Sequence, residues 1–144
     1  MLDKTRATLT IHSQTDELER VRQFVRDAAL RFGFSRNDAE KIVTATDEAC
    51  ANVILHGYNS DPSRHINIGI ETNGKSFAVT IDDDGKSYDL RKHVSPDMKV
   101  YLAERRRGGL GIKLIHMLVD DIEYVVRGSH NRLTLTKRLP DSSQ

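Results

Sequence analysis

The stretch that decides the fold lies at residues 46–58 and reads TDEACANVILHGY. Apolar residues recur through it at helical spacing, and the helix is expected to end near Gly57. Glu48, Asn52 and His56 stand four residues apart, so we expect them on one helical face. An acid and a carboxamide stacked in this way suit a hydrated cation beside a general base, because Asn offers Mg²⁺ a neutral oxygen and Glu can accept a proton. The alternative is the solvated polar stripe that any amphipathic helix carries.

Helices and strands are predicted on both sides of this stretch. Residues 18–32 carry apolar side chains at helical spacing up to Gly33, and Ser35 with Asp38 resembles a capping box that opens the helix leading to residue 46. Period-two alternation predicts five strands, at residues 6–11, 65–72, 76–82, 121–127 and 132–139, and a further helix is predicted over 112–119. This order predicts one α+β domain, a sheet with helices on one face.

Length and composition limit the class of protein. The chain has 144 residues, of which 38% are hydrophobic and 30% charged, as in a globular domain with one core. Its 22 basic and 21 acidic residues give a net charge of +1, which argues against direct binding of nucleic acid. No apolar run approaches the roughly 20 residues that cross a bilayer, and the N-terminus lacks the apolar segment of a secretion signal. The lone Cys50 excludes an intramolecular disulfide. We therefore expect a single cytoplasmic domain over residues 1–144, without membrane contact.

A second polar segment follows the predicted strand 76–82 and reads DDDGKSYD at residues 82–89. A carboxylate at a strand end can accept a hydrogen bond from an exocyclic amine, and Gly85 would let the backbone approach a flat ring. Asp and Gly are also common turn formers, so an ordinary acidic turn is the alternative.

A third segment, at residues 105–113, reads RRRGGLGIK. Glycines that run into a helix leave backbone N–H groups free to hold phosphates, and the arginines before them can clamp a terminal phosphate. A solvated basic face is the alternative. The glycines also lack the third position of a dinucleotide-binding fingerprint.

One further match must be rejected. Residues 69–76 read GIETNGKS and fit the Walker A expression letter for letter. That motif needs a strand, a phosphate-binding loop and then a helix. Here a strand is predicted on both sides, and Asn73-Gly74 is a strong hairpin signal. We therefore predict a hairpin and no P-loop.

Together, in this order and spacing, the three polar segments resemble the N, G1 and G2 boxes of the histidine-kinase-like ATPase superfamily. The resemblance is greatest to the anti-sigma-factor serine/threonine kinases and covers nearly the whole chain. The boxes are met by Glu48, Ala49, Asn52, His56 and Tyr58, then by Asp83, Gly85, Tyr88 and Asp89, and then by Gly109, Leu110, Gly111 and Asp120. The resemblance implies the Bergerat-type fold, a two-layer α/β sandwich with a mixed, mostly antiparallel sheet. Ser87 departs from the pattern, because broader superfamily members have a second glycine there.

The resemblance also implies a role for each site residue. Glu48 would be the catalytic general base, and Asn52 would hold Mg²⁺ bound to the phosphates of ATP. Asp83 would read the adenine amine, with Gly85 making room for the base. A lid over the nucleotide would span about residues 90 to 108. The remaining nucleotide contacts would come from Arg105, Arg107, Gly109, Leu110 and Gly111, whereas His56 and Tyr58 would tie the helix end to the sheet.

The function that the resemblance implies is that of a bacterial serine/threonine protein kinase dependent on ATP and Mg²⁺. It would phosphorylate an anti-sigma-factor antagonist, bind a sigma factor and form a homodimer. The alternative is a nucleotide-gated binding module of the same partner-switching circuit that transfers no phosphate.

Overall fold

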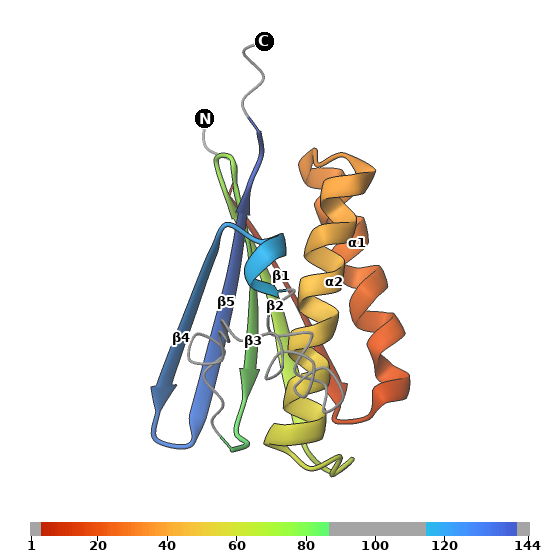
Figure 1. The fold of residues 1–144 in the computed structure, drawn as a ribbon, viewed down its shortest axis with the longest axis vertical. Helices are drawn as coiled ribbons and strands as arrows, with labels where there is room; N and C mark the ends of the chain where they lie inside the picture. Colours follow the sequence, from red (N-terminus) through yellow and green to blue (C-terminus); the bar gives the residue numbers. More distant parts are fainter. Residues whose placement is uncertain (1–3, 87–114, 141–144) are drawn as a thin grey trace, which may run out of the picture.

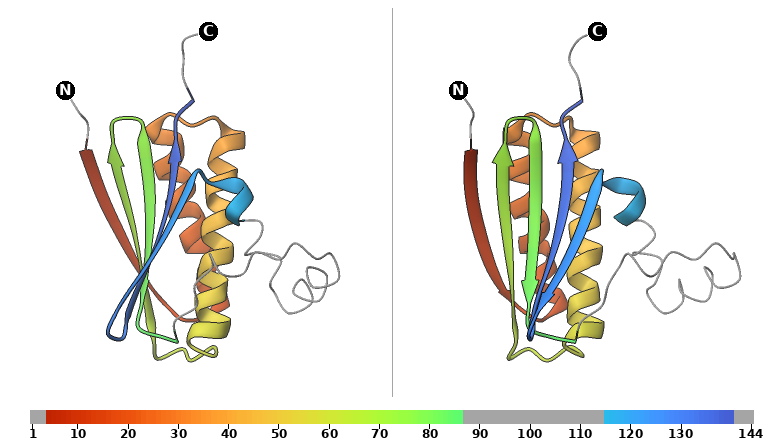
Figure 2. Two further views of the ribbon diagram at one scale, coloured as in Figure 1. Left: turned by 60° about the vertical axis from the view of Figure 1, so that its left-hand side comes forward. Right: turned by 90° about the vertical axis from the view of Figure 1, so that its left-hand side faces the viewer.

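The computed structural model describes residues 4–86 and 115–140, which form a sheet layer and a helical layer (Figure 1). In chain order the elements are β1 (Lys4–His12), η1 (Thr15–Glu17), α1 (Leu18–Phe32), α2 (Arg36–Asn52), η2 (Val53–Gly57), β2 (His65–Asn73), β3 (Ser76–Asp83), β4 (Asp121–Arg127) and β5 (His130–Arg138). Residues 115–118 are also helical. Figure 2 shows α1 and α2 covering one face of the sheet, so the predicted α+β architecture is confirmed.

The sheet has five strands in the order β1-β2-β3-β5-β4. All four pairings of these described strands are antiparallel, so the sheet is more regular than the mixed one expected. β5 lies between β3 and β4. This order pairs β3 with β5, two strands that are far apart in the sequence. In the β3–β5 register, Asp83 stands opposite Asn131.

The ends of the helices follow the local signals in the sequence. Gly33 ends α1 with a left-handed backbone, at a φ of 119°, which an L side chain rarely adopts. The Ser35 hydroxyl accepts a hydrogen bond of 3.1 Å from the backbone N–H of Asp38, which caps α2 as predicted. These two features separate the helices and set where α2 begins.

The core lies between the helices and the inner face of the sheet. Alternate residues of β2 and β3 are buried in it, namely Ile66, Ile68, Ile70, Phe77, Val79 and Ile81. Each such side chain contributes about 1.5–3 kcal/mol when it leaves water. Asp83 continues the alternation of β3, so its side chain is directed toward the helical layer and is 8% exposed.

The segment that matches Walker A by letter forms the β2–β3 hairpin. Asn73 pairs with Ser76 across the turn, and Gly74 takes a φ of 63°. Because a strand continues on each side, no helix N-terminus follows Lys75, and the rejection of a P-loop is confirmed.

Candidate functional site

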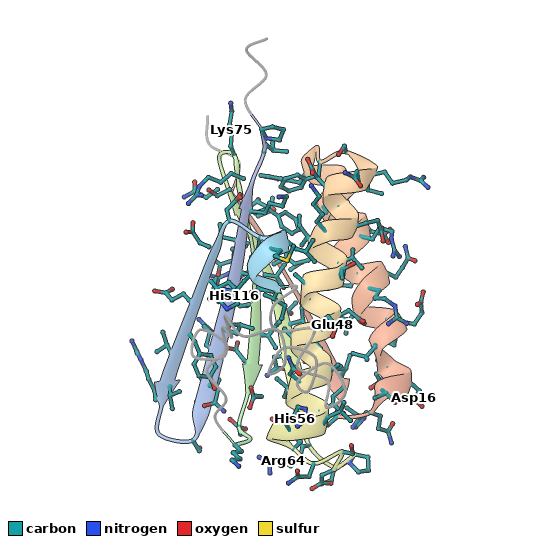
Figure 3. All side chains as sticks on the ribbon, in the orientation of Figure 1. Asp16, Glu48, His56, Arg64, Lys75 and His116 are labelled. Carbon is teal, nitrogen blue, oxygen red and sulfur yellow. The ribbon has the colours of Figure 1, made fainter. Side chains whose placement is uncertain are left out.

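The helix that carries Glu48 and Asn52 changes its winding directly after Asn52. Residues Val53–Gly57 form a π-helix, in which the N–H of Tyr58 reaches the carbonyl of Val53 at 2.8 Å. Short π-helical segments within α-helices occur frequently at functional sites. Asn52 is buried and Glu48 half-buried, whereas His56, farther along the helix in Figure 3, is exposed. The predicted polar face is therefore half-buried at Glu48, buried at Asn52 and at the surface at His56.

Asn52 lines a pocket at the end of the helical layer. The described lining consists of Ala49, Asn52, Val53, Gly57, Asp83, Lys86, Tyr124 and Leu133. Asn52 is only 7% exposed, and its Nδ2 has no hydrogen-bond partner within residues 4–86 and 115–140. An unpaired buried polar group costs about 1–3 kcal/mol. The carboxamide is therefore available to a polar group from outside the described chain, such as the hydration shell of a cation or a phosphate.

Asp83 enters the same pocket from the end of β3. Its Oδ1 accepts two hydrogen bonds, from the backbone N–H of Gly85 at 2.8 Å and from Nδ2 of Asn131 at 2.9 Å. Burial raises the pKa of Asp83 above its usual value, while these two hydrogen bonds oppose that rise by stabilising the charged form. The carboxylate is thus held in one orientation at the pocket wall.

The chain turns after β3 at residues 83–86, which we call the Asp83 turn. Gly85 makes the closest approach between this turn and the π-helix. A Cβ at this position would lie 2.6 Å from the carbonyl oxygen of Gly57 and 2.8 Å from Tyr58 Cδ1. The next residue donates its N–H to the same Gly57 carbonyl at 2.9 Å. Gly85 therefore permits the turn to seat directly against the backbone of the π-helix.

Tyr58 connects the π-helix to two strands. Its hydroxyl donates to the carbonyl of His65, at 2.7 Å, and accepts the backbone N–H of Asp84, at 2.8 Å. Tyr58 is 5% exposed. The prediction that Tyr58 ties the helix end to the sheet is confirmed.

Glu48 lies one helical turn before Asn52 and outside the described lining of the pocket. Burial raises the pKa of its carboxyl above the usual value, and the neighbouring charge of Asp47 raises it further. Arg22 of α1 approaches Asp47 at 2.7 Å and offsets part of that negative charge. Glu48 is therefore a more basic carboxylate than an exposed Glu, which suits a proton acceptor.

The structure thus brings together some of the predicted site residues. Asn52 and Asp83 line one pocket, and Gly85 packs behind it. The predicted lid at about residues 90 to 108 lies outside the described residues, as do Arg105, Arg107, Gly109, Leu110 and Gly111. In residues 4–86 and 115–140 no group of three or more His, Cys, Asp or Glu side chains could hold a metal ion.

Sequence reasoning missed Asn131, which is 1% exposed and bonded to Asp83. The last strand was predicted to begin at residue 132, which placed Asn131 in the turn, whereas β5 begins at His130. The available signal was that the inward alternation of residues 133 and 135, extended back by one step, reaches the polar residue 131. The strand partner was needed to interpret it, and local periodicity does not supply that partner.

A comparison with protein families identifies the family of the chain. Residues 11–137 match the family model described as the histidine kinase-like ATPase domain. The chain belongs to this family. Membership implies the use of ATP, and the resemblance predicted from the three boxes is confirmed.

The chain is also similar to curated proteins named serine-protein kinase RsbW. The chain is 36% identical to serine-protein kinase RsbW of Oceanobacillus iheyensis over 100 residues, which cover 66% of this chain and 63% of that relative. It therefore spans less than two thirds of that relative's length. Identity to the RsbW of Halalkalibacterium halodurans is 30% over 119 residues, covering 80% of this chain and 72% of the relative.

A solved structure supports the fold. The structure of the RsbU and RsbW domains of Rv1364c from Mycobacterium tuberculosis matches with a TM-score of 0.67 and 19% identity, covering 93% of this chain and 32% of that one. At this identity the likeness concerns the fold alone. Within the described residues of this chain, no helix is long and apolar enough to cross a membrane.

Proposed function

We propose that this chain is an ATP-dependent serine/threonine protein kinase that phosphorylates an anti-sigma-factor antagonist and binds a sigma factor. The observation that carries the proposal is the pocket itself. Asn52 at the end of α2 and Asp83 at the end of β3 line it together, and a basic carboxylate, Glu48, lies one turn away. The names of the curated relatives, serine-protein kinase RsbW, support the same reading.

Each of these side chains has a distinct task in the proposed reaction. Asp83 accepts a hydrogen bond from the adenine amine, which orients the nucleotide. Asn52 would hold Mg²⁺, and the ion would neutralise phosphate charge. Glu48 takes the proton from the serine or threonine hydroxyl of the substrate as that oxygen forms a bond to the γ-phosphorus of ATP and the bond between this phosphorus and ADP breaks. Positioning and charge neutralisation are the main sources of catalysis in this class of reaction.

The remaining parts of the proposal rest on the family resemblance. The lid at about residues 90 to 108, with Arg105 and Arg107, would close over the phosphates that Gly109, Leu110 and Gly111 hold. A homodimer in the bacterial cytoplasm is the proposed state of the protein.

The decisive experiment is phosphotransfer by the Glu48→Gln variant. Labelled ATP and an anti-sigma-factor antagonist protein from the same genome would be incubated with the wild type, with Glu48→Gln and with Glu123→Gln, a control at an exposed position of β4. Loss of a general base typically costs about 10²–10⁴-fold in rate. We expect transfer to be abolished in Glu48→Gln, ATP binding to stay nearly unchanged, and the control to behave as the wild type.

Full kinase activity in Glu48→Gln would show that Glu48 is not the base. A wild type that captures its partners only with ATP, but transfers no phosphate, would instead establish the nucleotide-gated binding module.

A further inference from the structure

Asn131 is a buried polar side chain that reaches the pocket residues from β5. It is the second residue of that strand, it stands opposite Asp83 in the strand register, and it is 1% exposed. Alternation along β5 directs its side chain to the same inner face as Leu133 and Leu135. A carboxamide placed among apolar neighbours needs hydrogen-bond partners to offset the cost of its burial.

Those partners are both acceptors on the Asp83 turn. Nδ2 of Asn131 donates to Oδ1 of Asp83 at 2.9 Å and to the carbonyl of Gly85 at 2.9 Å. Because two acceptors face the amide, only its NH₂ end can occupy this position, which settles its orientation. Both hydrogens of that NH₂ group are thereby used.

The same contact determines which oxygen of Asp83 is left for a ligand. Oδ1 receives one hydrogen bond from Asn131 and one from the N–H of Gly85, whereas Oδ2 takes part in neither. A carboxylate oxygen has room for about two such donors. Within residues 4–86 and 115–140, Oδ2 is therefore the oxygen of Asp83 left to accept a hydrogen bond from a molecule in the pocket.

The backbone of the turn has other attachments that do not involve Asn131. The N–H of Asp84 donates to the Tyr58 hydroxyl at 2.8 Å, and the N–H of Lys86 donates to Gly57 at 2.9 Å. On the outer face, the ring of His130 lies 3.5 Å from a carboxylate oxygen of Asp84. Removing the amide of Asn131 therefore leaves the Asp83 carboxylate with the N–H of Gly85 as its one remaining donor of the two, while the backbone of the turn keeps these supports.

We propose that Asn131 is a positioning residue that aims the Asp83 carboxylate at the base and so sets the preference of the pocket for adenine over guanine nucleotides. This inference rests on the proposed role of Asp83 as the acceptor of the adenine amine. Guanine carries a carbonyl where adenine carries its amine, so a fixed carboxylate meets a second acceptor and rejects guanine. A carboxylate held by the N–H of Gly85 alone can rotate more readily and loses much of that rejection, because neither base then faces a firmly fixed partner.

The test is nucleotide binding by calorimetry, with ATP and GTP as separate ligands. Asn131→Ala removes both donated hydrogen bonds, and Asn131→Ser restores one hydroxyl donor. The matched control is Asn67→Ala, which removes an exposed Asn of β2 that bonds to Thr10. Phosphotransfer is not needed for this measurement, so it does not depend on Glu48.

We expect ATP affinity to fall about tenfold in Asn131→Ala, as when a hydrogen bond to a charged group is lost, and the ATP-to-GTP ratio to fall with it. Asn131→Ser should give an intermediate ratio, and Asn67→Ala the ratio of the wild type. The fitted stoichiometry reports the folded fraction, so partial unfolding does not imitate a change in ratio.

An Asn131→Ala protein that is less stable but keeps the wild-type ratio would make Asn131 merely structural and overturn the inference, while the nucleotide site would stand. A wild type that binds ATP and GTP equally would remove the role of Asp83 and the inference with it. A wild type that binds neither nucleotide would refute the proposed function itself.

Discussion

Two glycine-containing turns at opposite ends of the sheet differ sharply in what surrounds them. The β2–β3 hairpin matches a phosphate-loop expression letter for letter, and Figure 3 shows its Lys75 at the far end of the sheet from His56 and Arg64. The turn after Asp83 matches a shorter pattern, yet Tyr58, Asn131 and the π-helix all bond to it. The comparison teaches that a turn becomes a binding site through its contacts with distant segments. A match to a sequence motif does not by itself supply a helix that faces a phosphate, or a buried hydrogen-bond acceptor.

The strongest way to break this comparison is Gly85→Ala. Its Cβ would meet the backbone of Gly57 at 2.6 Å, and backbone cannot move aside as a side chain can. We expect a loss of about 1–3 kcal/mol in the free energy of unfolding and loss of detectable ATP binding, measured by denaturant titration and calorimetry.

A matched glycine change away from the Asp83 turn is Gly69→Ala, in the middle of β2. There the new Cβ would meet the hydroxyl of Thr80 at 2.5 Å, and that hydroxyl can turn to another rotamer. ATP binding should be unaffected. Equal losses of ATP binding in the two variants would contradict a specific role of the turn after Asp83 in nucleotide binding.

Asp83→Asn should have the next largest effect. The Asn131 amide would hold the new side chain by its oxygen, which leaves the NH₂ end toward the base. A donor then faces the adenine amine, so ATP affinity should fall about tenfold or more, whereas GTP should bind relatively better. Calorimetry with both nucleotides measures the two affinities. An unchanged ratio of ATP to GTP affinity would exclude Asp83 as the residue that recognises the adenine amine.

A smaller effect is expected from pH through Glu48. Burial, and then the charge of Asp47, raise the pKa of this carboxyl. When pH is lowered, Glu48 should therefore become protonated, and phosphotransfer should stop, at a higher pH than if the base were an exposed Glu. Asp47→Asn should move the midpoint of the pH–rate profile downward. Low pH should act on stability in the opposite direction to its effect on the rate. Because the pKa of Glu48 is raised in the folded state, its ionised form lowers the free energy of unfolding, and this loss disappears as pH falls through the folded pKa. A midpoint that does not move in Asp47→Asn would refute this electrostatic account.

The smallest effect is expected from Lys75→Ala. Lys75 lies in the hairpin loop with no helix after it, so ATP affinity should not change. An exposed substitution of this kind usually alters stability by no more than about 0.5 kcal/mol. Loss of ATP binding in this variant would restore the phosphate-loop reading of the hairpin.

Much of the fold could be predicted from local pattern. The bounds of α1, the cap at Ser35 and both hairpins agree with the predicted elements within a few residues. The polar pair Glu48 and Asn52 could also be predicted, since a regular helix places residues four apart on one face. The burial of Asn52 and the exposure of His56 could not, because the π-helix after Asn52 depends on what packs against that end of α2.

By itself, the sequence determined the elements that depend on near neighbours, because capping, turn geometry and hydrophobic periodicity act over a few residues. Only the tertiary structure decided that β5 lies beside β3, and with it the contact between Asn131 and Asp83. Strand pairing over such a distance is chosen by which apolar faces bury one another best. That choice is a property of the whole core, so no single segment of the chain contains it.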